Sequence, residues 1–210
     1  STLSTLTTGA GAVTLTGSGN LTLGTVTTAT SIAGGTMTGA LTYTDTGIAV
    51  TSGSGNDVFT LGAATTASIN AGAGNDSFTA VAGSGLTSAD TLNGGDGTDS
   101  VTLTGNTVVT GLNFDNVSNI EAITVANTTT NVAITTVEAL VAAGATLTGT
   151  FSTLTTGTLT FNGAAENNGF FNITGGGAAD TITGGLNADT ITGGNGADTI
   201  TGGLNADTIT

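Results

Sequence analysis

The hydrophobic pattern is clearest in residues 175–210, where single apolar residues alternate with polar ones at a fixed period. Four nonapeptides follow one another: GGGAADTIT, GGLNADTIT, GGNGADTIT and GGLNADTIT. In each, one Ile stands between two Thr, which predicts a short strand with one inward side chain. The glycines that begin each unit predict a turn. Two units make one 18-residue coil, so successive turns should alternate between two edges of the molecule.

Residues 1–51 show the same alternation in a less regular form. The segments Ala12–Thr16, Asn20–Leu23 and Ala40–Thr44 alternate apolar and polar residues, and Gly, Ser and Asn separate them. We expect short strands there, which form Thr-rich rungs of a solenoid. The hexapeptide STLTTG also occurs twice, at 4–9 and 152–157, each time before a TLT segment, which predicts equivalent rungs.

Residues 52–102 contain a first, degenerate version of the nonapeptide array. The units SGSGNDVFT and AGAGNDSFT place Asp57 and Asp76 nineteen residues apart, which is about one coil. Phe59 and Phe78 then share the inward position in consecutive coils, and we expect their rings to stack.

The second half of this array is closer to the nonapeptide pattern. The unit GGDGTDSVT at residues 94–102 matches it in full, and its Asp99 lies nine residues after Asp90. Residues 81–88, which separate the two halves, are expected to form a loop inserted between coils.

Residues 103–174 lack the Asp motif, and we interpret them as β-rich connecting rungs. NIEAITV is echoed by TVEALV, which places Glu121 and Glu138 seventeen residues apart, about one coil. A short helix over 137–143 is the alternative for the second segment, because Ala, Glu and Leu favour helices. Four phenylalanines should plug the coils ahead of the terminal array: Phe151, Phe161, Phe170 and Phe171.

Together these patterns predict an all-β protein, a right-handed parallel β-solenoid or β-roll with nonapeptide repeats. Composition adds a constraint: the 210 residues include no Lys, Arg, His, Cys, Pro or Trp, and the formal charge is −14. No cationic side chain can neutralise a carboxylate, so metal ions are the obvious counterions. Nucleic acid is excluded as a partner because phosphate neutralisation needs Lys or Arg. No apolar run approaches the ~20 residues that span a bilayer.

The rows of Asp are the candidate metal ligands. Asp supplies a hard anionic oxygen, and turn glycines let backbone carbonyls converge on an ion, which is the donor set that Ca²⁺ prefers. Stacked turns bring like charges together, an arrangement that is repulsive without an ion. The predicted calcium-binding residues are Asp180, Asp189, Asp198, Asp207, Asp57, Asp76, Asp90, Asp99, Asp96, Gly176, Gly185, Asn187, Gly194, Gly196, Gly203 and Asn205.

The terminal row should divide between the two edges of the solenoid, with Asp180 and Asp198 on one edge and Asp189 and Asp207 on the other. Solvated turn aspartates are the alternative for each row. For Asp96, a calcium ligand and a water-facing side chain are equally open.

The other acidic residues lie outside the motif. Asp45, Asp115 and Glu166 are interpreted as solvated loop residues, and Glu121 and Glu138 as structural residues at the edges of rungs. A catalytic role has little support, because the chain has no His or Cys to act as base or nucleophile and no Lys for a Schiff base. We therefore expect a protein that is not an enzyme.

The terminal array resembles the repeats-in-toxin (RTX) family. In residues 71–126, AGAGNDSFT is followed by LNGGDGTDSVTLTG and VSNIEAITVAN, an order that looks like the RTX-containing S-layer proteins of Gram-negative bacteria. The resemblance covers roughly residues 52–130 and 175–210. It implies an extracellular, calcium-dependent structural protein that assembles with copies of itself into a surface layer or matrix fibre, with cell-surface polysaccharide as a further partner. The chain would be a segment of a longer protein.

Three other functions stay open: an RTX adhesin stalk, an ice-binding module, and an accessory calcium domain of a secreted toxin or enzyme. An ice-binding face needs the same Thr position repeated from coil to coil. The residue before the GND triplet changes from Ser54 to Ala73, so that turn carries no repeated Thr. This makes ice binding the weaker alternative.

Overall fold

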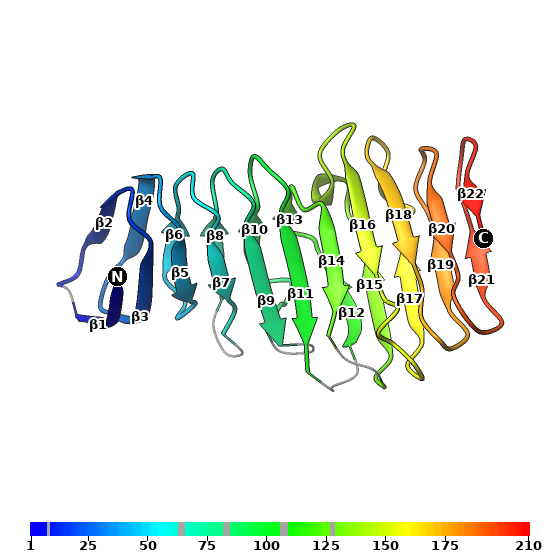
Figure 1. Ribbon diagram of the computed structural model, residues 1–210, viewed down its shortest axis with the longest axis horizontal. Coiled ribbons are helices and arrows are strands. Elements are labelled where there is room, and N and C mark those ends of the chain that lie inside the picture. The colour runs from blue at the N-terminus through cyan, green and yellow to red at the C-terminus, as the bar shows by residue number, and fades with distance from the viewer. Residues whose placement is uncertain (8, 63–65, 82–84, 106–108, 127–128) are drawn as a thin grey trace.

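The computed structural model describes residues 1–7, 9–62, 66–81, 85–105, 109–126 and 129–210. Over these residues the secondary structure is almost entirely β, and the parallel strands form a β-solenoid (Figure 1). The coils stack along one axis, and the two chain ends lie at opposite ends of the stack. The expected all-β solenoid is confirmed. No helix in the described residues is long and apolar enough to cross a membrane.

One long sheet runs through the whole solenoid. This 11-stranded parallel sheet, called sheet A here, takes one strand from every coil and passes through all four predicted segments, whose boundaries stay predictions. Its strands are β1 (Thr2–Thr7), β3 (Leu21–Thr27), β5 (Leu41–Thr44), β7 (Val58–Thr60), β9 (Ser77–Val81), β11 (Ser100–Thr104), β14 (Ala122–Val125), β16 (Thr146–Thr150), β18 (Phe170–Thr174), β20 (Thr190–Thr192) and β22 (Thr208–Ile209).

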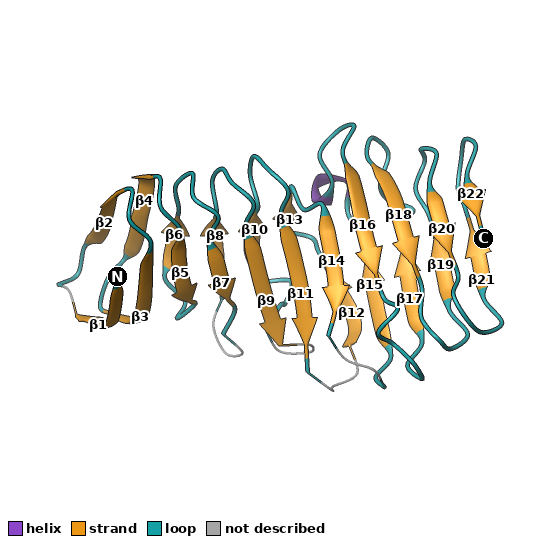
Figure 2. Ribbon diagram, in the orientation of Figure 1, coloured by secondary structure: helices purple, strands orange, loops and turns teal. Residues whose placement is uncertain are grey.

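The remaining strands form two shorter parallel sheets, one for each half of the solenoid (Figure 2). Sheet B consists of β2 (Ala12–Gly17), β4 (Ser31–Met37), β6 (Ala49–Thr51), β8 (Ser68–Asn70), β10 (Thr91–Asn93) and β13 (Val117–Ser118). Sheet C consists of β12 (Val109–Asn113), β15 (Val132–Thr135), β17 (Leu159–Asn162), β19 (Thr181–Thr183) and β21 (Thr199–Thr201).

The change from sheet B to sheet C takes place within one coil. Between β11 and β14 the chain contributes β12 to sheet C and β13 to sheet B. In the next coil the 3-10 turn η1 (Glu138–Leu140) continues beside β13, since the Ile120 N–H donates to the Leu140 carbonyl at 2.9 Å. The middle coils therefore have a third side, which the two-sided nonapeptide coils lack.

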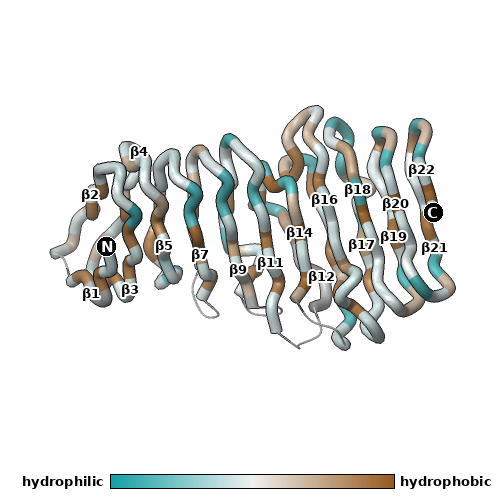
Figure 3. The backbone as a smooth tube through the Cα atoms, in the orientation of Figure 1, coloured by the Kyte–Doolittle hydropathy of each residue, from teal (hydrophilic) through white to brown (hydrophobic). Residues whose placement is uncertain are grey.

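The core is a thin column of inward side chains that repeats from strand to strand. Hydrophobic residues recur along the strands of successive coils, where the tube is brown in Figure 3. The Phe59 and Phe78 rings stack as expected, with ring centroids 5.3 Å apart. Near the C-terminus the column narrows to single isoleucines. The inward positions of sheet A are Leu23, Tyr43, Phe59, Phe78, Val101, Ile123, Gly149, Ile173, Ile191 and Ile209.

The Glu121 and Glu138 segments lie side by side in neighbouring coils, but at an offset of 20 residues instead of the 17 expected, because the Asn119 and Ile120 N–H groups donate to the Ala139 and Leu140 carbonyls. Ala122, which follows Glu121, pairs with Thr148 in β16, so the coil is longer than the seventeen residues expected. The alternative helix is present only as the three-residue turn η1. Local similarity misled the prediction because loops of different length separate successive sheet A strands.

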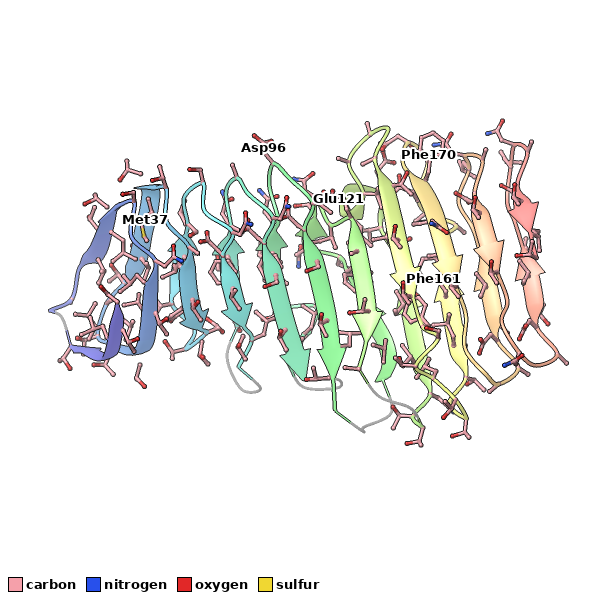
Figure 4. The ribbon with its side chains drawn as sticks, in the orientation of Figure 1. Met37, Asp96, Glu121, Phe161 and Phe170 are labelled. Carbon is pink, nitrogen blue, oxygen red and sulfur yellow. The ribbon has the colours of Figure 1, made fainter. Side chains whose placement is uncertain are left out.

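Three of the four predicted plugs, Phe151, Phe161 and Phe171, are buried. Phe161 contacts both of the others, with an edge-on ring 5.2 Å from Phe171. Phe170 is only half-buried, so its predicted core position is wrong: it precedes the inward Phe171 on an alternating strand (Figure 4).

Two sequence-based expectations in the loops have different outcomes. The STLTTG copies are not equivalent, because residues 4–7 lie in β1 whereas 152–157 form the turn between β16 and β17; residue 8 lies outside the described residues. Of the predicted loop insertion at 81–88, residues 82–84 lie outside the described residues. Val81 ends β9, and Leu86 is buried.

An unbroken column of threonines runs along the outward face of sheet A. The repeated Thr position therefore lies on sheet A and not in the turn before the GND triplet. Neighbouring hydroxyls come within hydrogen-bond distance, 3.1 Å between Thr102 and Thr124 and 2.9 Å between Thr192 and Thr210. We call this column the Thr rank: Thr44, Thr60, Thr79, Thr102, Thr124, Thr150, Thr174, Thr192 and Thr210.

Candidate calcium sites

The four terminal aspartates divide between two edges of the solenoid, as predicted. Asp180 and Asp198 lie directly before the sheet C strands β19 and β21, and the Asp180 N–H donates to Asp198 Oδ1 at 2.9 Å. Asp189 and Asp207 lie directly before the sheet A strands β20 and β22, and they make the same contact at 2.9 Å. Each carboxylate therefore links its own coil to the preceding one.

The degenerate array continues this arrangement. The N–H of Asp57 donates to Asp76 Oδ1, and the N–H of Asp76 donates to Asp99 Oδ1, both at 2.7 Å. One coil further on, the Asp99 N–H donates to Glu121 Oε2 at 2.8 Å. Glu121 thus takes the place of an aspartate, which the sequence analysis missed. The available signal was its position directly before the sheet A strand β14.

The second oxygen of each carboxylate distinguishes the two arrays. In the terminal array, Asp180 Oδ2 accepts from the Gly176 N–H, and Asp189 Oδ2 accepts from the Gly185 N–H, both at 2.6 Å. The early glycines of the nonapeptide therefore supply N–H donors to its Asp. In the degenerate array, Oδ2 of Asp76 and Oδ2 of Asp99 are buried and have no hydrogen-bond donor among the described residues. Such atoms carry an uncompensated desolvation cost.

Burial raises the pKa of these carboxyls because it disfavours the charged form. Burial raises the pKa of Asp76 to about 7, and the neighbouring charges of Asp57 and Asp99 add to the effect. Burial raises the pKa of Asp99 to about 6, with contributions from Glu121 and Asp96. The pKa values of Asp57 and Asp189 are also raised, chiefly by burial. The same rows would become more acidic beside a cation.

Asp90 and Asp96 lie off this row. Asp90 precedes the sheet B strand β10; its Oδ1 accepts from the Ala67 N–H, and its Oδ2 accepts from the backbone and hydroxyl of Thr87. Asp90 therefore caps a turn with both oxygens. Asp96 is exposed at the tip of its turn, as Figure 4 shows, where the water-facing alternative fits its surroundings.

The turns bring backbone carbonyls close to the next coil. A Cβ on Gly194 or Gly203, which have φ of 99° and 118°, would collide with the carbonyl of Gly176 or Gly185 in the preceding coil. Only glycine combines that φ with that approach. Asn205 takes the left-handed conformation at φ 65°, as expected of Asn at this position. Carbonyl oxygens and carboxylates therefore line the same turns.

These residues fit a calcium ion. No three acidic side chains come together among the described residues, so an ion there would take one or two carboxylates and otherwise backbone carbonyls. That is an all-oxygen donor set, which calcium prefers. The orphaned Oδ2 atoms of Asp76 and Asp99 mark places where positive charge is missing. The aspartate row and the turn carbonyls would hold the ion, which would supply the charge that the chain lacks.

Two other acidic residues differ from the prediction of solvated loops. Asp45 is buried, and its Oδ1 accepts from the Gly47 N–H at 3.0 Å. Glu166 is fully buried in the turn between β17 and β18. Only Asp115 is exposed as expected. Both corrections have one cause: a turn between stacked coils is covered by its neighbours even when its sequence is polar.

A comparison with protein families supports the calcium interpretation. A model of the RTX calcium-binding nonapeptide repeat matches residues 83–107 and 174–209, with four copies. No curated protein and no solved structure matches the chain significantly. RTX-repeat proteins are typically secreted by Gram-negative bacteria. The chain thus carries RTX calcium-binding nonapeptide repeats in these two stretches, and such repeats bind calcium.

Proposed function

We propose that this chain is a calcium-dependent, non-enzymatic structural protein outside the cell that assembles with copies of itself into a surface layer or matrix fibre. One observation carries the proposal: all 14 acidic residues lie outside the strands, in turns, loops or the turn η1. The strand faces therefore carry no charge. Calcium at the turns would remove the repulsion between copies, and the neutral faces could then pack together.

One edge of the terminal array also presents apolar side chains to solvent. Leu186 and Leu204 occupy the same position in turns one coil apart and are 38% and 61% exposed. The turns on the other edge have Gly177 and Asn195 at that position. A leucine pair on one edge only is suited to contact with a neighbouring molecule.

The neutral, hydroxyl-rich faces are equally suited to cell-surface polysaccharide as a second partner.

Light scattering and negative-stain electron microscopy across a calcium series test this proposal. We expect ordered sheets or fibres at high calcium that dissolve with chelator. The double variant Leu186→Ser/Leu204→Ser should weaken assembly but retain calcium-induced folding. Val58→Thr, which changes an exposed residue on sheet A, is the matched control. A chain that folds with calcium yet stays monomeric at high concentration would contradict the assembly role.

Ice binding is a second candidate, and the Thr rank is the observation that favours it. Adjacent strands of a sheet lie about 4.8 Å apart, so the rank presents a regular row of hydroxyls on an uncharged face. Thr102→Tyr/Thr124→Tyr should abolish any inhibition of ice recrystallisation, whereas Thr181→Tyr on sheet C should not. If the wild-type protein with calcium leaves ice growth unchanged, this function is excluded.

A further inference from the structure

The turn that precedes the terminal array carries an acidic group outside every nonapeptide. Residues 163–169 connect β17 to β18 and lie before the matched repeat at 174–209. The Glu166 carbonyl accepts from the Leu186 N–H at 3.0 Å, just as the Gly185 carbonyl accepts from the Leu204 N–H one coil later. Glu166 therefore occupies the coil position of a nonapeptide glycine, with a carboxylate where the repeats have no side chain.

The Glu166 carboxylate is buried and only half-satisfied. Its exposed fraction is 0%. Oε1 accepts from the backbone N–H groups of Asn168 at 3.1 Å and Gly169 at 2.8 Å. Oε2 is buried and has no hydrogen-bond donor among the described residues. A buried carboxylate oxygen without a partner is costly, and no Lys, Arg or His exists in this chain to compensate it.

A second orphaned acceptor lies in the same turn. Asn168 Oδ1 is buried, and no residue that the structure describes donates a hydrogen bond to it. The Nδ2 of this amide is engaged elsewhere, since it donates to the Glu138 carboxylate of the preceding coil. Asn167 Nδ2 donates to the same carboxylate, and Asn187 Nδ2 of the following coil donates to the Gly169 carbonyl at 3.0 Å. Contacts from three successive coils thus hold the turn in place.

Two buried oxygen acceptors two residues apart, both lacking donors, call for a positively charged ligand. We propose that residues 163–169 bind a calcium ion outside the nonapeptide motif, with Glu166 Oε2 and Asn168 Oδ1 as protein ligands. Carboxylate and amide oxygens are hard ligands that suit Ca²⁺, whose coordination is flexible enough for an irregular turn. The exposed Glu138 carboxylate adds negative charge nearby. This ion would hold together the coil from which the terminal array starts.

Equilibrium dialysis of the full chain with calcium, compared between wild type and Glu166→Gln, tests the proposal. We expect the variant to bind one calcium ion fewer per chain, because its amide keeps the shape but not the charge. Asp115→Asn is the matched control: it removes one charge from an exposed loop and should leave the number of ions unchanged. An unchanged number of bound ions in Glu166→Gln would overturn the proposal.

A measurement on the wild-type chain covers the case in which the variant does not fold. Mn²⁺ added in trace amounts to the calcium-loaded protein should broaden the NMR signals of the Asn168 and Gly169 amides, which donate to Glu166 Oε1. Excess calcium should restore them. If these two amides stay sharp while those beside the terminal aspartates broaden, residues 163–169 do not bind the ion.

Discussion

In both Asp arrays, the backbone N–H of one Asp donates to the carboxylate of the Asp one coil later, and we call this row of contacts the Asp ladder. The two arrays differ in what stabilises the buried carboxylates. In the terminal array, each buried Asp receives a second hydrogen bond from its own nonapeptide, as Asp189 does from Gly185, while the core is one Ile per strand. In the degenerate array, Asp76 lacks that second donor within the described part of the chain, but the strand that follows it carries Phe78, whose ring stacks on Phe59. The terminal array, which matches the nonapeptide motif more closely, therefore has the thinner hydrophobic core. Calcium should therefore matter most for folding where the core is thinnest.

The largest expected effect comes from removing the aromatic core of the degenerate array. Phe78→Ala deletes a ring that is fully buried, and it should lower the free energy of unfolding by about 3–5 kcal/mol. Urea unfolding in the presence of chelator measures this change. Thr79→Ala, on the outward face of the same strand, is the control and should stay within about 0.5 kcal/mol. Equal losses in both variants would mean that the ring stack does not stabilise this region.

Chelation should separate the two arrays. Without calcium, amides in β19–β22 should lose roughly 100-fold of their protection against hydrogen exchange, the change expected for a site that was saturated at about 100 times its Kd. Amides in β7 and β9 should keep most of theirs, because Phe59 and Phe78 remain packed. Hydrogen-exchange mass spectrometry resolves the two regions. Uniform loss along the chain would show that the solenoid unfolds as one unit.

The pH dependence of the melting temperature should have opposite signs in the calcium-free and the calcium-bound chain. The folded pKa values of Asp76, about 7, and Asp99, about 6, are above the ordinary value, so this stabilisation is present in acid and is lost as pH rises through 6 to 7. The chelated chain should therefore melt at a higher temperature at pH 5 than at pH 8. With calcium the order should invert, because calcium ligands must be ionised. Thermal melting at both pH values tests this; one order in both states would contradict it.

Neutralising one aspartate in each array should change the free energy of unfolding by a smaller amount, and the sign should differ between the arrays. Both variants are compared in chelator at pH 8. Asp76→Asn removes a buried charge with an orphaned oxygen and should stabilise the chain by about 1 kcal/mol. In Asp189 both carboxylate oxygens accept hydrogen bonds, one from the Phe171 N–H and one from the Gly185 N–H. Asp189→Asn replaces one of these oxygens with an amide N–H₂, which cannot accept, so it should destabilise the chain by about 1–3 kcal/mol. Urea titration of both variants provides the measurement. The same sign in both would remove the distinction between the arrays.

Much of this architecture could be predicted from local sequence. The nonapeptides specify turn, strand and the 18-residue coil within themselves, so the alternation of Asp180 and Asp189 between edges followed directly. The stacking of Phe59 on Phe78 followed from the one-coil spacing of two similar units. These predictions succeeded because each interaction joins neighbouring copies of one motif.

Elsewhere the coil length varies, and local similarity then says little about which strands pair. Asp76 and Asp99 are 23 residues apart, and the next step of the ladder, from Asp99 to Glu121, is 22. Loops absorb such differences at small entropic cost, so the fit of inward side chains selects the register. This explains why the Glu121 ladder position, the Thr rank and the change from sheet B to sheet C escaped prediction.

The sequence by itself determined the β-solenoid, its calcium-binding repeats and a chemistry without any cationic side chain. Only the tertiary structure decided which carboxylates are buried and which oxygens lack donors. Glu166 shows the reason: its neighbours in sequence are polar, yet adjacent coils exclude water from it. Burial in a solenoid depends on the residues one coil before and after, and that distance varies wherever the repeat is irregular.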